Sequence, residues 1–134
     1  MKRLIGLGTD IVEIERIRSM RLQHGEAFDA RCFTERERTY AASYRDGGHA
    51  QLAGRFAAKE AALKALGSGL RDGMAWTDIE VVLDPHGAPS LRVRGDVELA
   101  AAARGIDHWM VSISHGRDYA VATVIGGAVE KESP

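Results

Sequence analysis

The stretch from residue 55 to residue 70, RFAAKEAALKALGSGL, constrains the fold of this chain more than any other. Its first twelve residues all suit a helix, five of them are alanine, and two glycines follow as a stop signal. Because alanine side chains are small, other elements can approach such a helix closely, so we expect a central, well-covered helix that begins near Ala50. Charges on a covered helix need partners, because burying an unpaired charge costs several kcal/mol.

The charges of this helix fall into two groups. At about 100° per residue, Arg55 and Lys59 lie among apolar residues, whereas Glu60 and Lys64 share a second strip one turn apart. Three cations against one carboxylate suit an anionic ligand, with phosphate as the obvious class. The alternative is a solvated helix whose Glu60–Lys64 pair contributes only about 0.2–0.5 kcal/mol. The helix alone leaves both interpretations open.

Length and composition indicate one soluble globular domain, with 134 residues, 45% hydrophobic and 28% charged. A net charge of -1 does not point to nucleic acid, but the first 70 residues carry 12 Lys/Arg against 9 Asp/Glu. That excess favours phosphate ligands or an acidic partner. Cys32 is the single cysteine, so an intramolecular disulfide is excluded, and we expect it to be a small buried hydrophobe. The N-terminal segment MKRLIGLGTD has too few apolar residues for a signal-peptide core or a membrane span, so we expect a cytoplasmic protein.

Hydrophobic periodicity and turn signals give the order of the elements. We expect strands over residues 4–12, 78–83, 90–93, 109–114 and 119–125. We expect helices over residues 13–22, 26–32, 35–44, 50–66 and 96–104, with a capping box at Thr34 and Glu37 and an N-cap at Asp96. Tight turns between strands favour an antiparallel sheet. The sequence therefore predicts an α+β fold, with one domain over residues 1–126, a long central helix and a flexible tail over 127–134.

The first strand carries a candidate functional carboxylate. Gly6, Gly8 and Asp10 share one face of it, and glycines inside a strand mark close approach by a ligand or another backbone. We expect open space beside Asp10, although Asp10 is also a candidate N-cap for the next helix. Mg²⁺ typically takes one or two protein carboxylates and keeps water or substrate phosphates. Asp10 and Glu60 with a basic helix therefore suit a magnesium–phosphate site, and the chain has no P-loop, G-x-G-x-x-G or zinc spacing.

Two other groups have weaker signals. Ser112 and His115 lie near a hairpin turn, but without a catalytic cysteine or G-x-S-x-G motif, nucleophilic catalysis is unsupported. Arg16, Arg18 and Arg21 are spaced along one short helix. Arginines spaced in this way usually form a solvated helix face, and the alternative is a docking face for an acidic partner.

Five segments occur together in a recognisable order and spacing. They are GLGTDIVEIERI at 6–17, FTERE at 33–37, GRFAAKEAALKALGSGL at 54–70, DPHGAP at 84–89 and VSISHGRDYAVATV at 111–124. Nearly the whole chain thereby resembles the holo-acyl-carrier-protein synthase family, the short class of 4'-phosphopantetheinyl transferases. The resemblance implies transfer of 4'-phosphopantetheine from coenzyme A to a serine of acyl carrier protein, in fatty acid biosynthesis, with release of adenosine 3',5'-bisphosphate. It also implies a homotrimer whose three sites are each shared between neighbours.

The resemblance implies a role for each matching residue. Asp10 and Glu60 match the Mg²⁺ ligands, Glu60 and Lys64 are the catalytic candidates, and Arg16 matches a cation that meets the carrier, with Arg18 and Arg21 beside it. The coenzyme A positions fall on Arg55, Lys59, Lys64, Gly67, Ser68, Gly69, Ser112 and His115. Either Glu60 or a metal-activated water is expected to take the serine proton. Two rival functions stay open at this point: a non-catalytic module that binds coenzyme A or nucleotides, and a hydrolase of the coenzyme A pyrophosphate.

Overall fold

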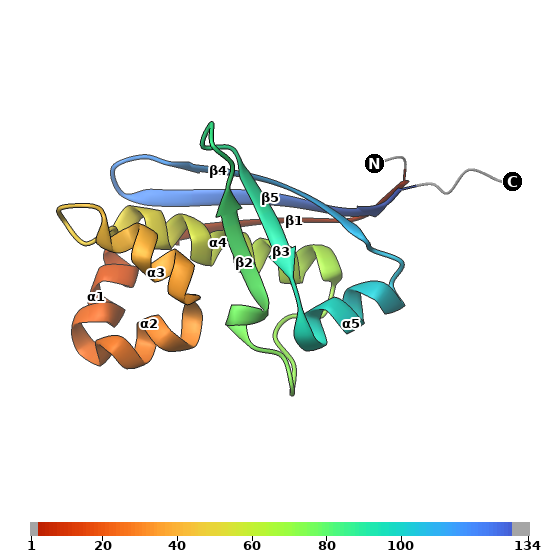
Figure 1. The fold of residues 1–134 in the computed structure, drawn as a ribbon, viewed down its shortest axis with the longest axis horizontal. Helices are drawn as coiled ribbons and strands as arrows, with labels where there is room; N and C mark the ends of the chain where they lie inside the picture. Colours follow the sequence, from red (N-terminus) through yellow and green to blue (C-terminus); the bar gives the residue numbers. More distant parts are fainter. Residues whose placement is uncertain (1–2, 130–134) are drawn as a thin grey trace, which may run out of the picture.

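The structure, a computed structural model, describes residues 3–129. Its strands are β1 (Arg3–Glu13), β2 (Ile79–Leu83), β3 (Pro89–Val93), β4 (His108–His115) and β5 (Tyr119–Ala128). Its helices are α1 (Ile14–His24), α2 (Glu26–Cys32), α3 (Glu35–Ala42), α4 (His49–Leu66) and α5 (Gly95–Ala103), with a 3-10 helix η1 at Trp76–Asp78 (Figure 1). Each predicted strand and helix is present, and the α+β fold with antiparallel sheets and a long central helix is confirmed. β5 passes the expected domain end at 126 by two residues, and residues 130–134 of the expected tail lie outside the described residues.

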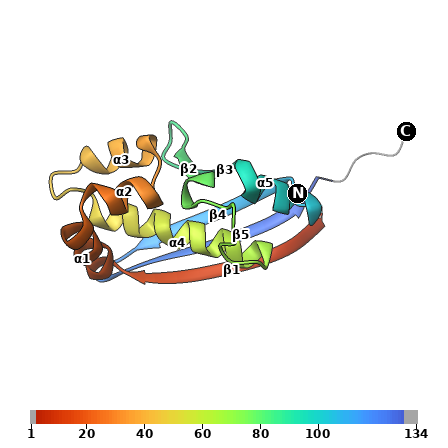
Figure 2. The same cartoon turned by 90° about the horizontal axis from the view of Figure 1, so that it is seen from below.

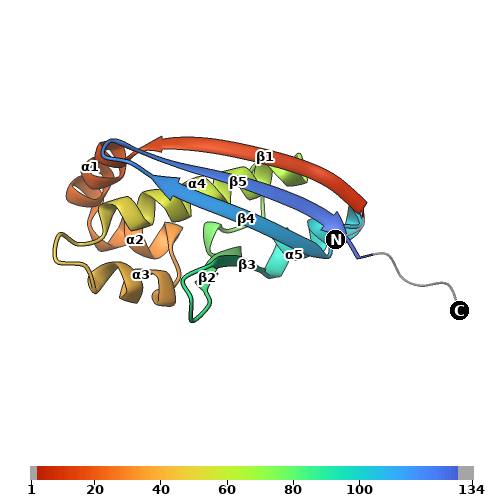
Figure 3. The ribbon, with the colours of Figure 1, turned by 90° about the horizontal axis from the view of Figure 1, so that it is seen from above.

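The helix α4 lies across one face of an antiparallel sheet with the strand order β1-β5-β4 (Figure 3). Two glycines of β1 allow this close packing. A Cβ atom on Gly6 would lie 1.8 Å from the Ala65 carbonyl oxygen, and one on Gly8 would lie 1.9 Å from that of Ala61. The expectation that these glycines leave open space beside Asp10 is therefore wrong, because the backbone of α4 fills that space.

The remaining elements pack around other sides of α4. β2 and β3 form an antiparallel hairpin whose residues Ile79 and Val81 are buried. The helices α1, α2 and α3 gather at the N-terminal end of α4, away from α5 (Figure 2). The capping box is confirmed, since Thr34 Oγ1 accepts from the Glu37 amide and Glu37 Oε1 accepts from the Thr34 amide. The predicted Asp96 cap is wrong, because α5 begins at Gly95 and Asp96 lies in its first turn.

The face of the three-stranded sheet opposite α4 exposes large apolar side chains. Leu7 is 67% exposed, Ile11 64% and Met110 56%. No helix within residues 3–129 covers this face, as Figures 2 and 3 show. A separate observation concerns membranes: among the described helices, none is both long and apolar enough to cross a lipid bilayer.

Candidate active site

Asp10, Glu60 and Lys64 lie together where β1 passes the C-terminal half of α4. Lys64 Nζ donates hydrogen bonds to Asp10 Oδ1 and to the Thr9 carbonyl oxygen, each at 3.0 Å. Glu60 precedes Lys64 by one helical turn. The Asp10 side chain is 18% exposed and that of Lys64 53%, so the cluster is open to solvent. Asp10 does not cap α1, whose N-cap residue is Glu13.

The electrostatics of this cluster suit a divalent cation. Burial raises the pKa of Glu60, and the charge of Asp10 raises it further, while Lys64 and Arg16 act in the opposite direction. A cation beside both carboxylates would relieve this penalty, because opposite charge favours the ionised form. Within residues 3–129 no three or more His, Cys, Asp or Glu side chains are placed to bind one metal ion. Two open carboxylates therefore suit Mg²⁺ that shares its remaining positions with water or substrate phosphates.

Arg55 and His115 lie on the other flank of α4, beside β4. They line a pocket of about 220 Å³ together with Tyr40 and Gln51. The Arg55 Cζ atom lies 4.2 Å from the centroid of the Tyr40 ring, and Arg55 Nη1 donates to the Gln51 carbonyl oxygen at 3.3 Å. Burial lowers the pKa of Arg55 from its usual value, but a guanidinium is protonated in proteins. The pocket thus presents a desolvated cation to an anionic ligand.

Ser112 and His115, both predicted to bind coenzyme A, lie on opposite faces of the sheet. Ser112 pairs with Thr123 on the uncovered face, whereas His115 pairs with the buried Ala120 on the face toward α4. Residues three apart in a strand point in opposite directions. One chain therefore does not bring Ser112 and His115 to the same site.

Lys59, also predicted to bind coenzyme A, is fully buried. Its Nζ donates to Glu37 Oε1 at 2.8 Å, to the Trp76 carbonyl oxygen at 3.1 Å and to the Ile79 carbonyl oxygen. Burial lowers the pKa of Lys59, and the charge of Glu37 opposes that shift. All three N–H bonds of the ammonium have acceptors inside the protein. Lys59 is therefore part of the core in this structure, and we do not assign it to the ligand site.

The predicted loop of Gly67, Ser68 and Gly69 follows α4 directly. Gly67 and Gly69 have φ angles of 85° and 68°, in the left-handed region that glycine adopts without strain. Ser68 Oγ donates to the Gly69 carbonyl oxygen at 2.9 Å. Arg104, which no motif indicated, donates to the Leu66 carbonyl oxygen and so adds a cation at the end of α4. The loop follows Lys64 by three residues in the chain, and its role as a ligand site stays a prediction.

Comparisons with known proteins identify the family. A model of the 4'-phosphopantetheinyl transferase superfamily matches residues 6–124. A holo-[acyl-carrier-protein] synthase from Geobacillus kaustophilus is 46% identical over 123 residues, covering 91% of this chain and 88% of the relative. The chain belongs to the holo-acyl-carrier-protein synthase family. It is therefore a phosphopantetheinyl transferase, and the predicted enzyme class is confirmed.

Solved structures of this transferase family share the fold. The synthase from Neisseria meningitidis matches with a TM-score of 0.83 at 32% identity, covering 92% of this chain and 98% of that one. The synthase from Bacillus anthracis, solved in complex with CoA (3',5'-ADP), matches with a TM-score of 0.78 at 34% identity, covering 95% and 99%. The fold described above is thus that of known transferases across almost the whole chain.

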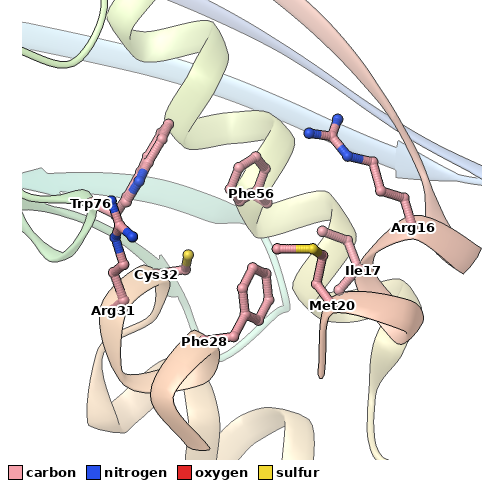
Figure 4. Close-up of a pocket in the computed structure, with 8 residues that line it drawn as sticks. All are labelled: Arg16, Ile17, Met20, Phe28, Arg31, Cys32, Phe56 and Trp76. Carbon is pink, nitrogen blue, oxygen red and sulfur yellow. The ribbon is translucent and has the colours of Figure 1, made fainter. Parts of the chain in front are cut away.

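The arginines of α1 in this transferase have different surroundings. Arg16 lines a pocket of about 180 Å³, which Figure 4 shows with Met20, Phe28 and Phe56 at its centre. Arg18 forms an exposed 3.0 Å ion pair with Glu15. The charge of Arg16 also lowers the pKa of Glu60.

Arg21 does not share the surface of Arg16, because its guanidinium is used inside the protein. It pairs with Asp29 at 3.1 Å and donates to the Gly47 carbonyl oxygen at 2.8 Å, and its Nη1 lies 2.9 Å from His49 Nδ1. Burial lowers the pKa of His49, the cations Arg21 and Arg18 lower it further, and the carboxylates Asp46 and Asp29 raise it. The structure therefore uses Arg21 to join α1, α2 and the start of α4.

Proposed function

We propose that this transferase moves 4'-phosphopantetheine from coenzyme A to a serine of apo-acyl carrier protein at the cluster of Asp10, Glu60 and Lys64. The observation that supports this assignment is the exposed Lys64 ammonium bonded to Asp10 one turn from Glu60. Two N–H bonds of Nζ are used within residues 3–129, and the third has no acceptor among these residues, so it can bind a phosphate oxygen. A cytoplasmic location remains our expectation from the sequence.

The reaction breaks the phosphoanhydride bond of coenzyme A and forms a phosphoester bond to serine. The serine hydroxyl oxygen forms a bond to the β-phosphorus of coenzyme A, and the bond from that phosphorus to the bridging oxygen breaks, which leaves adenosine 3',5'-bisphosphate. Such transfers depend on positioning and charge stabilisation more than on covalent chemistry. Mg²⁺, when bound by Asp10 and Glu60, would neutralise charge on the pyrophosphate. Lys64 stabilises the departing phosphate, and Glu60, whose pKa is raised, is a candidate to accept the serine proton.

The complete site requires more than one chain. Asp10, Glu60 and Lys64 lie on the β1 flank of α4, whereas Arg55 and His115 lie on its β4 flank. The helix α4, which packs directly on the sheet, lies between them, and we infer that one ligand takes its contacts from two chains. A second copy that presents its β4 flank to the β1 flank of the first would unite them, and the apolar sheet face gives the copies a surface to bury. Repetition of this heterologous contact around a closed three-fold axis gives the trimer that the family resemblance implies.

Subunit complementation tests this assembly. Asp10→Asn and Arg55→Gln are each expected to be inactive, but mixed trimers would contain sites with an intact Asp10 from one chain and an intact Arg55 from the next. Random mixing leaves about a quarter of the sites intact, so activity should return after the two variants exchange subunits. Light scattering should show three chains per particle. No recovery after demonstrated exchange would place each site within one chain.

The carrier protein docks beside Arg16. This residue carries a positive charge at an apolar pocket, and its charge acts on Glu60. An acidic helix with a protruding apolar side chain matches both features, since the pocket accepts the side chain and Arg16 attracts the acidic groups. Arg18 is exposed but pairs with Glu15, and residues two apart on a helix do not share a face, so Arg16 is the residue we assign to this surface. Arg21 is bonded to Asp29 and to the Gly47 carbonyl oxygen.

One measurement tests the reaction and separates it from its rivals. Purified protein is mixed with coenzyme A, Mg²⁺ and apo-acyl carrier protein, and the intact mass of the carrier is recorded. Transfer predicts a mass gain equal to one phosphopantetheinyl group. Cleavage of coenzyme A without a mass gain would indicate a hydrolase, and intact coenzyme A with unmodified carrier would indicate a binding module.

A further inference from the structure

Tyr40 on α3 forms the wall against which the Arg55 guanidinium lies. The guanidinium carbon lies 4.2 Å from the centroid of the Tyr40 ring, well within the range of a cation–π interaction. Arg55 is 6% exposed, and the structure describes one hydrogen bond from its side chain, the 3.3 Å bond from Nη1 to the Gln51 carbonyl oxygen. Its Nε–H is buried without an acceptor among residues 3–129. The aromatic ring is therefore a main restraint on the plane of this cation.

Tyr40 is itself held in place by Tyr44, one helical turn later. Their hydroxyl oxygens are 2.7 Å apart, and their rings meet edge to face at 70° with centroids 5.4 Å apart. This hydrogen bond raises the pKa of Tyr44. The N-terminus of α3 is fixed in turn by the capping box at Thr34. The contacts with Tyr44 and the capping box together restrain the position of the Tyr40 ring.

We propose that Tyr40 is a positioning residue for coenzyme A: its ring, part of the wall of the pocket, fixes the Arg55 guanidinium with Nε–H free, and so raises affinity through Arg55. This inference rests on the proposed function, in which Arg55 binds an anionic group of coenzyme A. An arginine side chain has about 2 kcal/mol of rotamer entropy, and stacking reduces what is lost when a ligand binds. An unpartnered donor buried in the free protein gains a hydrogen bond when a phosphate arrives. Both effects strengthen ground-state binding of coenzyme A.

The test uses Tyr40→Leu, which keeps an apolar side chain but removes the ring, and Tyr40→Phe, which keeps the ring. Calorimetric titration with coenzyme A and Mg²⁺, without carrier protein, gives the affinity of each folded variant. We expect Tyr40→Leu to bind coenzyme A roughly 3- to 30-fold more weakly, and Tyr40→Phe to stay within about twofold of wild type. KM for coenzyme A should rise by the same factor in Tyr40→Leu, while kcat at saturating coenzyme A stays unchanged.

A double-mutant cycle separates positioning from direct contact. In the Arg55→Gln background, Tyr40→Leu should cause no further loss of coenzyme A affinity, because the residue through which it acts is gone. A loss of equal size in both backgrounds would mean that Tyr40 contacts coenzyme A itself, and would overturn the inference. Unchanged affinity in folded Tyr40→Leu would overturn it too. Should Tyr40→Leu not fold, Tyr40→Met, which is more flexible, takes its place with the same two criteria.

The proposed function can fail separately from this inference. If wild-type protein modifies the carrier but Arg55→Gln binds coenzyme A normally, Arg55 and Tyr40 lie outside the ligand site while the reaction stands. If wild-type protein does not modify the carrier, the proposed reaction is wrong whatever the Tyr40 variants show.

Discussion

Replacing Lys59 with methionine would leave the Glu37 carboxylate without its cation in the interior of the protein. The two side chains are 0% exposed and lie 2.8 Å apart. Glu37 would keep the amide donors of Thr34 and Val81, while the Trp76 and Ile79 carbonyl oxygens would each lose a donor. Removing one member of a buried ion pair typically costs about 3–5 kcal/mol. Since whole domains are stable by only about 5–15 kcal/mol, Lys59→Met should lose a large fraction of its free energy of unfolding.

The assay is urea unfolding followed by circular dichroism, at one fixed protein concentration because assembly adds to apparent stability. Lys64→Met is the matched control, since it is the same chemical change on the same helix. The Lys64 side chain is 53% exposed, and exposed ion pairs contribute only about 0–1 kcal/mol. The double variant Glu37→Gln/Lys59→Met removes both charges, so it should cost less than the sum of the two single variants by roughly 0.5–3 kcal/mol.

The result that would refute this reasoning is a specific one. If Lys59→Met unfolds at the same urea concentration as wild type but binds coenzyme A much more weakly, Lys59 leaves the core to reach the ligand. Its place among the coenzyme A residues, implied by the family resemblance, would then be correct. Unchanged coenzyme A affinity in the folded fraction of Lys59→Met would instead support a structural lysine.

Three further predictions follow from the site. Asp10→Asn and Glu60→Gln should remain folded, with stability within about 1 kcal/mol of wild type, while the transfer rate falls by orders of magnitude because metal stabilisation of the phosphoryl group contributes several kcal/mol. Transfer rates measured against Mg²⁺ concentration, with thermal melts alongside, check this. Normal transfer in folded Glu60→Gln would exclude the metal assignment. Arg16→Glu should raise KM for the carrier protein without changing coenzyme A affinity, whereas Arg21→Glu should mainly lower the stability of the fold. An unchanged KM in Arg16→Glu would exclude Arg16 from the docking surface. The pKa of His49 in the folded protein lies below its ordinary value of 6.5, so the unfolded state binds the proton first as pH falls. The free energy of unfolding should therefore decrease from about pH 6.5 toward the folded pKa. Urea unfolding at several pH values should show a smaller decrease in His49→Gln, and an equal decrease would assign the pH dependence to other groups.

The order and type of the elements were predictable because their signals are local. The Thr34–Glu37 capping box marks the start of α3, and both reciprocal hydrogen bonds are present. Asp84 Oδ1 accepts from the amides of His86 and Ala88, so the turn between β2 and β3 is stabilised by the residue that signals it. Each of these interactions spans no more than four residues. Such patterns can be predicted from the sequence because they do not depend on the tertiary fold.

Contacts between distant segments were not predictable in the same way. Glycines in a strand fit close approach of a ligand or of another backbone, and only the packing of β1 on α4 shows that Gly6 and Gly8 meet the helix. Arg21 resembled its neighbours on α1, and its partner Asp29 and the carbonyl of Gly47 come from other elements. The opposite orientations of Ser112 and His115 follow from the period of a strand alone. The sequence alone therefore predicts that Ser112 and His115 point to opposite faces, although both belong to the same motif at 111–124.

The adjacent residues Lys59 and Glu60 have opposite environments because they point about 100° apart on α4. Lys59 is bound to Glu37 and to carbonyl oxygens of the segment before and within β2, which restrains rotation of α4 about its axis. Contact of the helix backbone with Gly6 and Gly8 restrains its distance from β1. With rotation and distance both restrained, Glu60 lies where the charge of Asp10 raises its pKa. The buried lysine therefore contributes to the site by orienting the carboxylate next to it, and a helix of alanines is what allows both restraints to act on the same backbone.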